Sequence, residues 1–228
     1  MKRSLLSTST AIAIAIAVAP ATASATITEV GATRTPIASP ICPPGVTKTN
    51  CTIILTETTA LPALSDKVYY PTTVKTAGRI VAFTVGLASL ATTDITGLNA
   101  AYGGQAEAAI AILKRKGRSF EFTVKYATPL VKLQPYLGHV VQFPLSTTLP
   151  VVPGDLIALT VPTWAPVLYI QLPSKSFRYR ASRAKLCTTF NVQTAQQTVG
   201  QKATYNCFYD STRVEFSATE VTNPVAGK

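Results

Sequence analysis

Short apolar segments separated by turns rich in proline and glycine run through most of the chain. In RIVAFTVGLASL, alternate residues from Val81 to Leu87 would share one face of an extended strand. Ile80 and Ala82 make the other face apolar too, so we expect this strand to be buried on both sides. A helical period is absent after the N-terminal leader, apart from a weak alanine-rich patch at residues 105–111. We therefore expect an all-β fold, and favour a two-sheet antiparallel β-sandwich of the jelly-roll type.

The clearest predicted hairpin is EAAIAILKRKGRSFEFTVKY. Ile110 and Ile112 share a face before its turn, and alternate residues from Phe120 to Tyr126 share one after it. Gly117 supplies a residue that accepts positive φ in a tight turn. Further strands are expected in TIILTET, HVVQF, DLIALTV, VLYIQL and RVEFSATEV, to give about nine or ten short strands in all.

The N-terminus has the pattern of a secretory signal peptide. Lys2 and Arg3 precede an apolar stretch that is too short to span a bilayer comfortably and that ends in small residues. We expect this leader to be removed and the rest of the protein to be secreted without a transmembrane segment. The expected organisation is a signal peptide at 1–25, an extended lead-in rich in Thr, Pro and Gly at 26–50, a β-sandwich domain at 51–222 and a tail at 223–228.

Four cysteines allow three pairings. Export into an oxidising space favours disulfides over a metal site, and loop closure favours the local pairs Cys42 with Cys51 and Cys187 with Cys207. The sequence itself leaves all three pairings open. A zinc site would lack a CxxC motif and would have a single histidine, His139, to draw on. We therefore expect neither a metal nor another cofactor.

Familiar catalytic arrangements are missing from the sequence. His139 is the one histidine that could act as a base for a serine nucleophile, and no GxSxG motif surrounds any serine. Glycoside hydrolysis needs two carboxylates at a defined separation, and the acids form no close motif. Those considered for such a role are Glu107, Glu121, Asp155 and Asp210. The sequence favours a non-enzymatic protein, with a polysaccharide hydrolase or lyase and a structural envelope component as alternatives.

Positive charge is the most pronounced chemical feature. Lys and Arg number 21 against 10 acidic residues, and the formal charge of +11 falls to +9 once Lys2 and Arg3 leave with the leader. Cations beside aromatic residues are typical of contacts with polyanions or single-stranded nucleic acid, although charge also protects edge strands from pairing. The candidate residues are Lys114, Arg115, Lys116 and Arg118 at the hairpin tip, and Arg178, Arg180 and Arg183 in SFRYRASR.

Aromatic residues could add a platform for sugar rings. The candidates are Tyr102, Trp164, Tyr169 and Tyr179. Trp164 lies between two prolines in VPTWAPV, which we interpret as a turn: exposed it would be a ligand platform, buried it would fill the core. Asp155 follows a glycine at the entry to a strand, where its carboxylate is expected to cap free N–H groups of the turn.

The leader, the early cysteine pair and the segments GRIVAFTVGLA and PVVPGDLIALTVP resemble a group of small secreted β-sandwich proteins of actinobacteria, most without an assigned function. The resemblance covers roughly Cys51 to Val221. It implies a jelly-roll-like sandwich of the kind that carbohydrate-binding modules also use, and it identifies no catalytic residue. We expect an exported protein that binds an anionic or carbohydrate polymer of the cell envelope or its surroundings. Nucleic acid is a less favoured partner, and the oligomeric state stays open.

Overall fold

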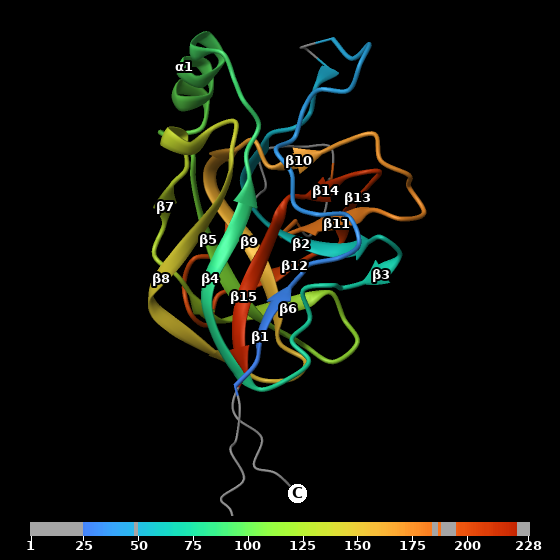
Figure 1. Ribbon diagram of the computed structural model, residues 1–228, viewed down its shortest axis with the longest axis vertical. Coiled ribbons are helices and arrows are strands. Elements are labelled where there is room, and N and C mark those ends of the chain that lie inside the picture. Colours follow the sequence, from blue (N-terminus) through green and yellow to red (C-terminus); the bar gives the residue numbers. More distant parts are fainter. Residues whose placement is uncertain (1–24, 48–49, 184–186, 188–194, 223–228) are drawn as a thin grey trace, which may run out of the picture.

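The computed structural model describes residues 25–47, 50–183, 187 and 195–222. The predicted tail and all but the last residue of the predicted leader lie outside these ranges. Antiparallel strands dominate the described residues, and a single α-helix stands at one end of the molecule (Figure 1). The prediction of an all-β sandwich is confirmed. No helix among the described residues is long and apolar enough to cross a membrane.

The smaller sheet has the strand order β1-β15-β4-β8. Its strands are β1 (Ile27–Val30), β15 (Phe216–Thr222), β4 (Gly78–Gly86) and β8 (Val140–Val151). Strand β4 is central and mostly buried on both faces, as predicted. The pairing of β4 with β8 shifts register between Ile80 and Ala82, so Val81 is half-buried while Ile80 and Phe83 both enter the main core. The strict alternation expected from Val81 onward was wrong at that bulge.

The larger sheet follows the order β12-β6-β5-β9-β2-β11-β13, with β3 beside β2 and β7 beside β5. Its strands are β12 (Lys202–Thr204), β6 (Glu121–Ala127), β5 (Glu107–Arg115), β9 (Leu156–Ala165), β2 (Leu55–Ser65), β11 (Arg178–Ala181), β13 (Cys207–Asp210), β3 (Val68–Tyr69) and β7 (Val131–Lys132). A short pair joins β10 (Leu168–Tyr169) to β14 (Arg213–Val214). The predicted hairpin is confirmed as β5 and β6, and Gly117 in its turn has φ 56°.

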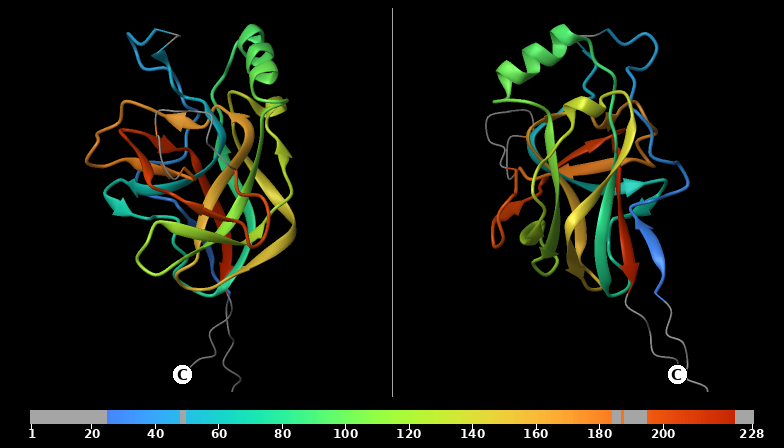
Figure 2. Two further views of the ribbon diagram at one scale, coloured as in Figure 1. Left: turned by 180° about the vertical axis from the view of Figure 1, so that it is seen from behind. Right: turned by 60° about the vertical axis from the view of Figure 1, so that its left-hand side comes forward.

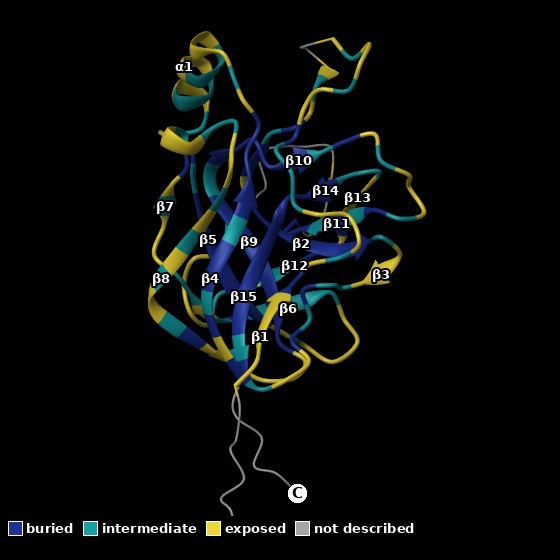
Figure 3. Ribbon diagram, viewed as in Figure 1, coloured by how far each residue is buried: buried dark blue, intermediate teal, exposed yellow. Residues whose placement is uncertain are grey.

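The larger sheet curls strongly. Strands β12 and β13 are consecutive in the chain yet lie at opposite ends of the strand order, and the backbone N–H of Tyr205 between them donates to Phe120 O over 2.7 Å (Figure 2). The curl encloses a second apolar core beside the main one. On β5, Ile110 and Ile112 pack in the main core, whereas Ala111 and Leu113 pack in the second. Both faces of β5 are therefore buried (Figure 3).

A buried hydrogen-bond network lies beside the second core. The Tyr205 hydroxyl donates to the side-chain oxygen of Gln196, and burial raises the pKa of that hydroxyl. The Gln196 backbone N–H donates to Thr59 Oγ1 over 2.7 Å, and the Thr59 hydroxyl is 2.7 Å from that of Thr160. Together these contacts tie the segment before β12 to β2 and β9 inside the curl.

Removing the Tyr205 hydroxyl should destabilise the curl measurably. The change Tyr205→Phe keeps the ring and leaves the Gln196 oxygen buried without this donor, so we expect a loss of about 1–3 kcal/mol in the free energy of unfolding. Chemical denaturation of the oxidised protein measures it. Tyr126→Phe, at a side chain that is 36% exposed, is the matched control and should change little. Equal, small effects of the two substitutions would contradict the role given to the hydroxyl.

The helix α1 (Thr92–Ala101) was not predicted. Its sequence, TTDITGLNAA, has no buried residue, and Ile95 and Leu98 are only partly buried against the main core. Without a continuous apolar stripe, a periodicity search has little to find. The helix is tied to the body by Trp164, whose indole N–H donates to Asn99 Oδ1 over 3.1 Å and to Gly104 O over 3.0 Å.

Trp164 is fully buried and is the penultimate residue of β9. The interpretation of VPTWAPV as a turn was therefore wrong. The ladder between β9 and β2 shifts register opposite Pro162, where Thr56 pairs with Trp164 and Thr58 with Val161. Proline lacks an N–H to donate, and a bulge is where a strand tolerates that loss. Trp164 is therefore part of the core and not a ligand platform.

Two disulfides, Cys42–Cys51 and Cys187–Cys207, confirm the favoured local pairing. Each joins Cα atoms less than 6 Å apart, at 5.6 and 5.2 Å. The first closes a short loop at the end of the lead-in, and the second fastens the start of β13. Both crosslinks limit the freedom of the unfolded chain.

Candidate functional site: a basic and aromatic surface

The two basic segments of the sequence meet at the ring of Phe120, which lies just before β6. The guanidinium carbon of Arg115, at the end of β5, is 5.3 Å from the centre of this ring. That of Arg180, on β11, is 3.8 Å from it. Strands β5 and β11 are far apart in the strand order, so the curl of the larger sheet is what brings these side chains together.

The same arrangement continues onto β13. Phe208 pairs with Arg180 in the ladder between β11 and β13, and Arg178 pairs with Asp210. The guanidinium carbons of Arg180 and Arg178 lie 5.6 and 4.6 Å from the Phe208 ring centre. Cations and aromatic rings thus alternate across the curl. We call this set the basic–aromatic surface: Arg115, Phe120, Arg180, Phe208 and Arg178, with Lys114, Lys116 and Arg118 at the adjoining hairpin tip.

Backbone carbonyls fix two of these guanidinium groups. Arg115 donates from Nε to Ser119 O over 2.7 Å and from Nη2 to Arg118 O over 3.0 Å. Arg180 donates from Nη1 to Tyr205 O over 2.9 Å. A guanidinium held by a ring and by carbonyls retains its positive charge, since carbonyls do not neutralise it, and it has less side-chain freedom to lose on binding a ligand.

Acidic neighbours neutralise only part of the surface. Lys116 forms an ion pair with Glu121 over 3.2 Å, and Arg178 forms one with Asp210 over 2.5 Å. Within the described residues, no carboxylate pairs with Lys114 or Arg118, and both are exposed. The hairpin tip therefore presents positive charge to solvent.

Not every predicted residue joins this surface. Tyr179 is buried and stacked on Tyr209 at 4.8 Å, so it is not an exposed platform; burial also raises the pKa of its hydroxyl. Arg183 is buried as well, and its Nη1 donates to the Tyr209 hydroxyl over 2.9 Å. The prediction that these two side chains are available to a ligand was wrong. Alternation on β11 turns Tyr179 inward, and Arg183, two residues after the end of β11, is also buried. Tyr102 and Tyr169 are half-buried on other elements.

Phe208 was missed by the sequence reasoning, although 47% of it is exposed. It follows Cys207 in CFYD, and the buried cysteine implies that its neighbour on a strand faces outward. That alternation was available in the sequence. Its position beside Arg178 and Arg180 was not, because it depends on the pairing of β13 with β11.

Three of the four acids considered for hydrolysis have other partners. Asp155 accepts the Val152 N–H over 3.1 Å, which confirms its expected role in the turn, and it also pairs with Lys125. Glu121 and Asp210 pair with the cations named above. Each of these three acids thus has its own cationic partner.

A groove of about 780 Å³ lies between α1 and the loop closed by Cys42–Cys51. Most of its lining is apolar, and one carboxylate, that of Asp94, belongs to it. The lining includes Pro40, Ile41, Ile53, Leu90, Leu98 and Tyr102. A glycosidase site needs two carboxylates across a cleft, and the described lining of this groove holds one. Within the described residues, no three or more His, Cys, Asp or Glu side chains are grouped as metal ligands would be.

Comparison with known proteins found no matching family model, no matching curated protein and no matching solved structure.

Proposed function

We propose that the protein is an exported, non-enzymatic protein that binds an anionic polymer of the cell surface or its surroundings through the basic–aromatic surface. The observation that carries the proposal is the ring of Phe120 between Arg115 and Arg180, which joins two separate basic segments into one surface. Cations that served only solubility would not need to be gathered around a shared aromatic ring.

A flexible polyanion suits this surface on electrostatic grounds. Each phosphate, sulfate or carboxylate that meets a cation releases condensed counterions, so affinity grows with the number of contacts. Guanidinium groups offer several N–H donors in a plane to such oxygens. The formal charge of +9 that remains once Lys2 and Arg3 leave with the leader favours encounter with polyanions as a whole.

Anionic polymers fit better than neutral glycans. A sugar ring stacks on an open aromatic face, but the two aromatic rings of this surface already lie against guanidinium groups. Trp164 and Tyr179, two of the four aromatic candidates, are buried. The remaining exposed chemistry at the hairpin tip is cationic.

Binding to long-chain polyphosphate tests the proposal. We expect retention of the oxidised protein that weakens steeply with salt, and no retention on neutral dextran. The double variant Lys114→Ala/Arg118→Ala should bind about tenfold more weakly at low salt, and the slope of log K against log salt should fall by about 1.5, because two ionic contacts are lost.

The matched control is Arg79→Ala/Lys132→Ala, which removes the same charge elsewhere. Arg79 belongs to the smaller sheet. Lys132 lies on β7 opposite Glu107 in the strand ladder, at the end of β5 away from the hairpin tip. An equal loss of binding in this control would show that total charge decides retention. That result, or salt-independent binding of the unaltered protein, would overturn the proposal.

A further inference from the structure

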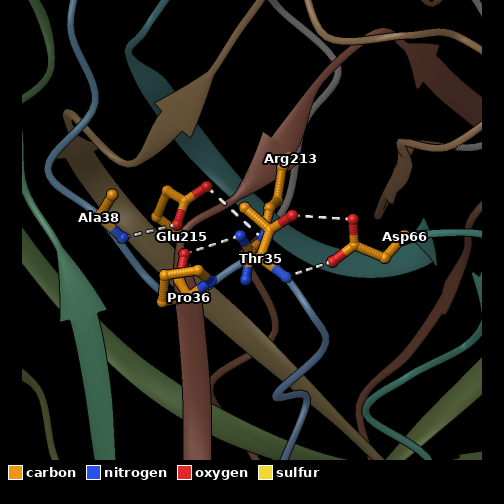
Figure 4. Close-up of polar contacts among 6 residues, drawn as sticks. All are labelled: Thr35, Pro36, Ala38, Asp66, Arg213 and Glu215. Atoms are coloured by element: carbon orange, nitrogen blue, oxygen red, sulfur yellow. Dashed lines mark hydrogen bonds and ion pairs between the residues drawn. The ribbon is translucent and has the colours of Figure 1, made fainter.

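Residues 31–40, here called the strap, follow β1 without regular secondary structure and are held by carboxylates from distant parts of the chain (Figure 4). Asp66, in the turn after β2, accepts the Thr35 N–H over 2.6 Å and the Thr35 hydroxyl over 2.8 Å. Glu215, just before β15, accepts the Ala38 N–H over 3.0 Å. The strap thus depends on two acids for its attachment.

Glu215 is buried beneath the strap, where it is 1% exposed. Its cationic neighbour is Arg213, whose Nε is 3.5 Å from Glu215 Oε1 and which is itself 3% exposed. Arg213 donates from Nη1 to Pro36 O over 3.0 Å, while its Nη2 has no acceptor among the described residues. The strap therefore covers a long, incompletely bonded ion pair, a kind of pair whose desolvation is costly.

The strap also packs closely on β4. A methyl group added at Gly86 would overlap the carbonyl oxygen of Ala38, so only glycine allows this approach. The Gly86 N–H donates to the backbone oxygen of Glu215 over 2.8 Å. Because strap, β4 and Glu215 are in contact, a small outward movement of the strap would admit water to the carboxylate.

Few charges face Glu215. Arg213 of β14 and Asp66 after β2 are the charged groups that act on it, whereas the strap and the end of β4 present backbone groups. Burial raises the pKa of Glu215 to about 7, although the charge of Arg213 and the Ala38 N–H lower it. For Asp66 burial also raises the pKa, but the two hydrogen bonds from Thr35 and the charge of Arg213 outweigh burial and leave the pKa below its ordinary value.

We propose that the strap is a pH-sensitive latch: it closes over Glu215 when this carboxyl group is protonated and loosens when the group ionises. The strap ends at Pro40, which with Ile41 forms one wall of the groove beside α1. Loosening the strap would free that wall, so the latch regulates the shape of the groove.

The direction follows from the two proton affinities. A closed state in which the pKa of Glu215 is about 7 holds a proton more tightly than an open state with the ordinary value of 4.5. The free energy by which protonated Glu215 favours the closed state is therefore fully present below pH 4.5, and it is lost as the pH rises through 7. Asp66 has the opposite pH dependence. Because its pKa is lowered in the closed state, it stabilises closure at neutral pH and loses this effect only below its ordinary pKa of 3.8.

Hydrogen exchange of residues 31–41 in the oxidised protein tests the latch, with labelling times corrected for the intrinsic effect of pH. Opening of the strap should increase roughly 50-fold between pH 5 and pH 8, given the pKa of about 7 when closed. In Glu215→Gln, which keeps an acceptor for the Ala38 N–H without a charge, protection at pH 8 should match that at pH 5.

The matched control is Glu220→Gln. Glu220 is another buried carboxyl on β15 whose pKa is raised by burial, but it contacts Thr28 of β1 rather than the strap. Residues 80–85 of β4 report global unfolding in the same experiment, so loss of the fold is recognised separately. A pH response that survives in Glu215→Gln, that disappears in Glu220→Gln, or that is absent from the unaltered protein would overturn the proposal.

Discussion

Replacing Trp164 with alanine is expected to lower the free energy of unfolding by about 3–5 kcal/mol, since deletion of a buried tryptophan costs its burial energy and leaves a cavity. Trp164 is fully buried in the main core at the end of β9. The substitution also removes the donor to Asn99 and Gly104, and with it the link that holds the C-terminal end of α1. Chemical denaturation measures the loss of stability.

Trp164→Phe separates packing from hydrogen bonding at this position. It keeps a buried aromatic ring but removes the indole N–H together with part of the indole ring, so we expect a cost smaller than that of Trp164→Ala, about 1–3 kcal/mol. Hydrogen exchange in residues 92–101 should increase in both variants, whereas exchange in β4 should increase mainly in Trp164→Ala. If α1 kept its protection in both, the helix would be held by Ile95 and Leu98 instead.

Local patterns in the sequence predicted the elements whose contacts are close in the chain. The hairpin of β5 and β6, the capping carboxylate of Asp155 and both disulfides join residues that are near neighbours in sequence. Helix α1 escaped prediction because an exposed helix with a threonine-rich sequence carries no apolar stripe, and its attachment comes from Trp164, far along the chain. Tertiary contact rather than propensity defines such a helix.

The candidate site was predicted as charge and not as geometry. Composition identified the cations at the hairpin tip and on β11, but alternation on β11 buries Tyr179 while Arg178 and Arg180 remain half-buried, and Arg183 is buried just after the strand ends. The meeting at Phe120 depends on the curl of the larger sheet, which places β12 and β13 at opposite ends of one strand order. Strand order is set by long-range packing, which period-two patterns do not encode.

Arg213→Ala should show the second large effect, and its size should depend on pH. Removing one member of a buried ion pair leaves the other charge uncompensated, so we expect a loss of about 3–5 kcal/mol in the free energy of unfolding at pH 8. At pH 5 the loss should fall below about 2 kcal/mol, because burial holds the pKa of Glu215 near 7 and the carboxyl is then protonated and needs no cation. Denaturation at the two pH values measures the difference.

The double variant Arg213→Ala/Glu215→Gln tests whether the uncompensated carboxylate causes that loss. With a neutral amide at Glu215, removal of Arg213 costs only its packing and its bond to Pro36 O, so much of the stability lost at pH 8 should return. The pH dependence should disappear as well. If the double variant were as unstable at pH 8 as Arg213→Ala, the guanidinium would act mainly by holding Pro36, and the strap would be secured by Arg213 rather than by the protonation of Glu215.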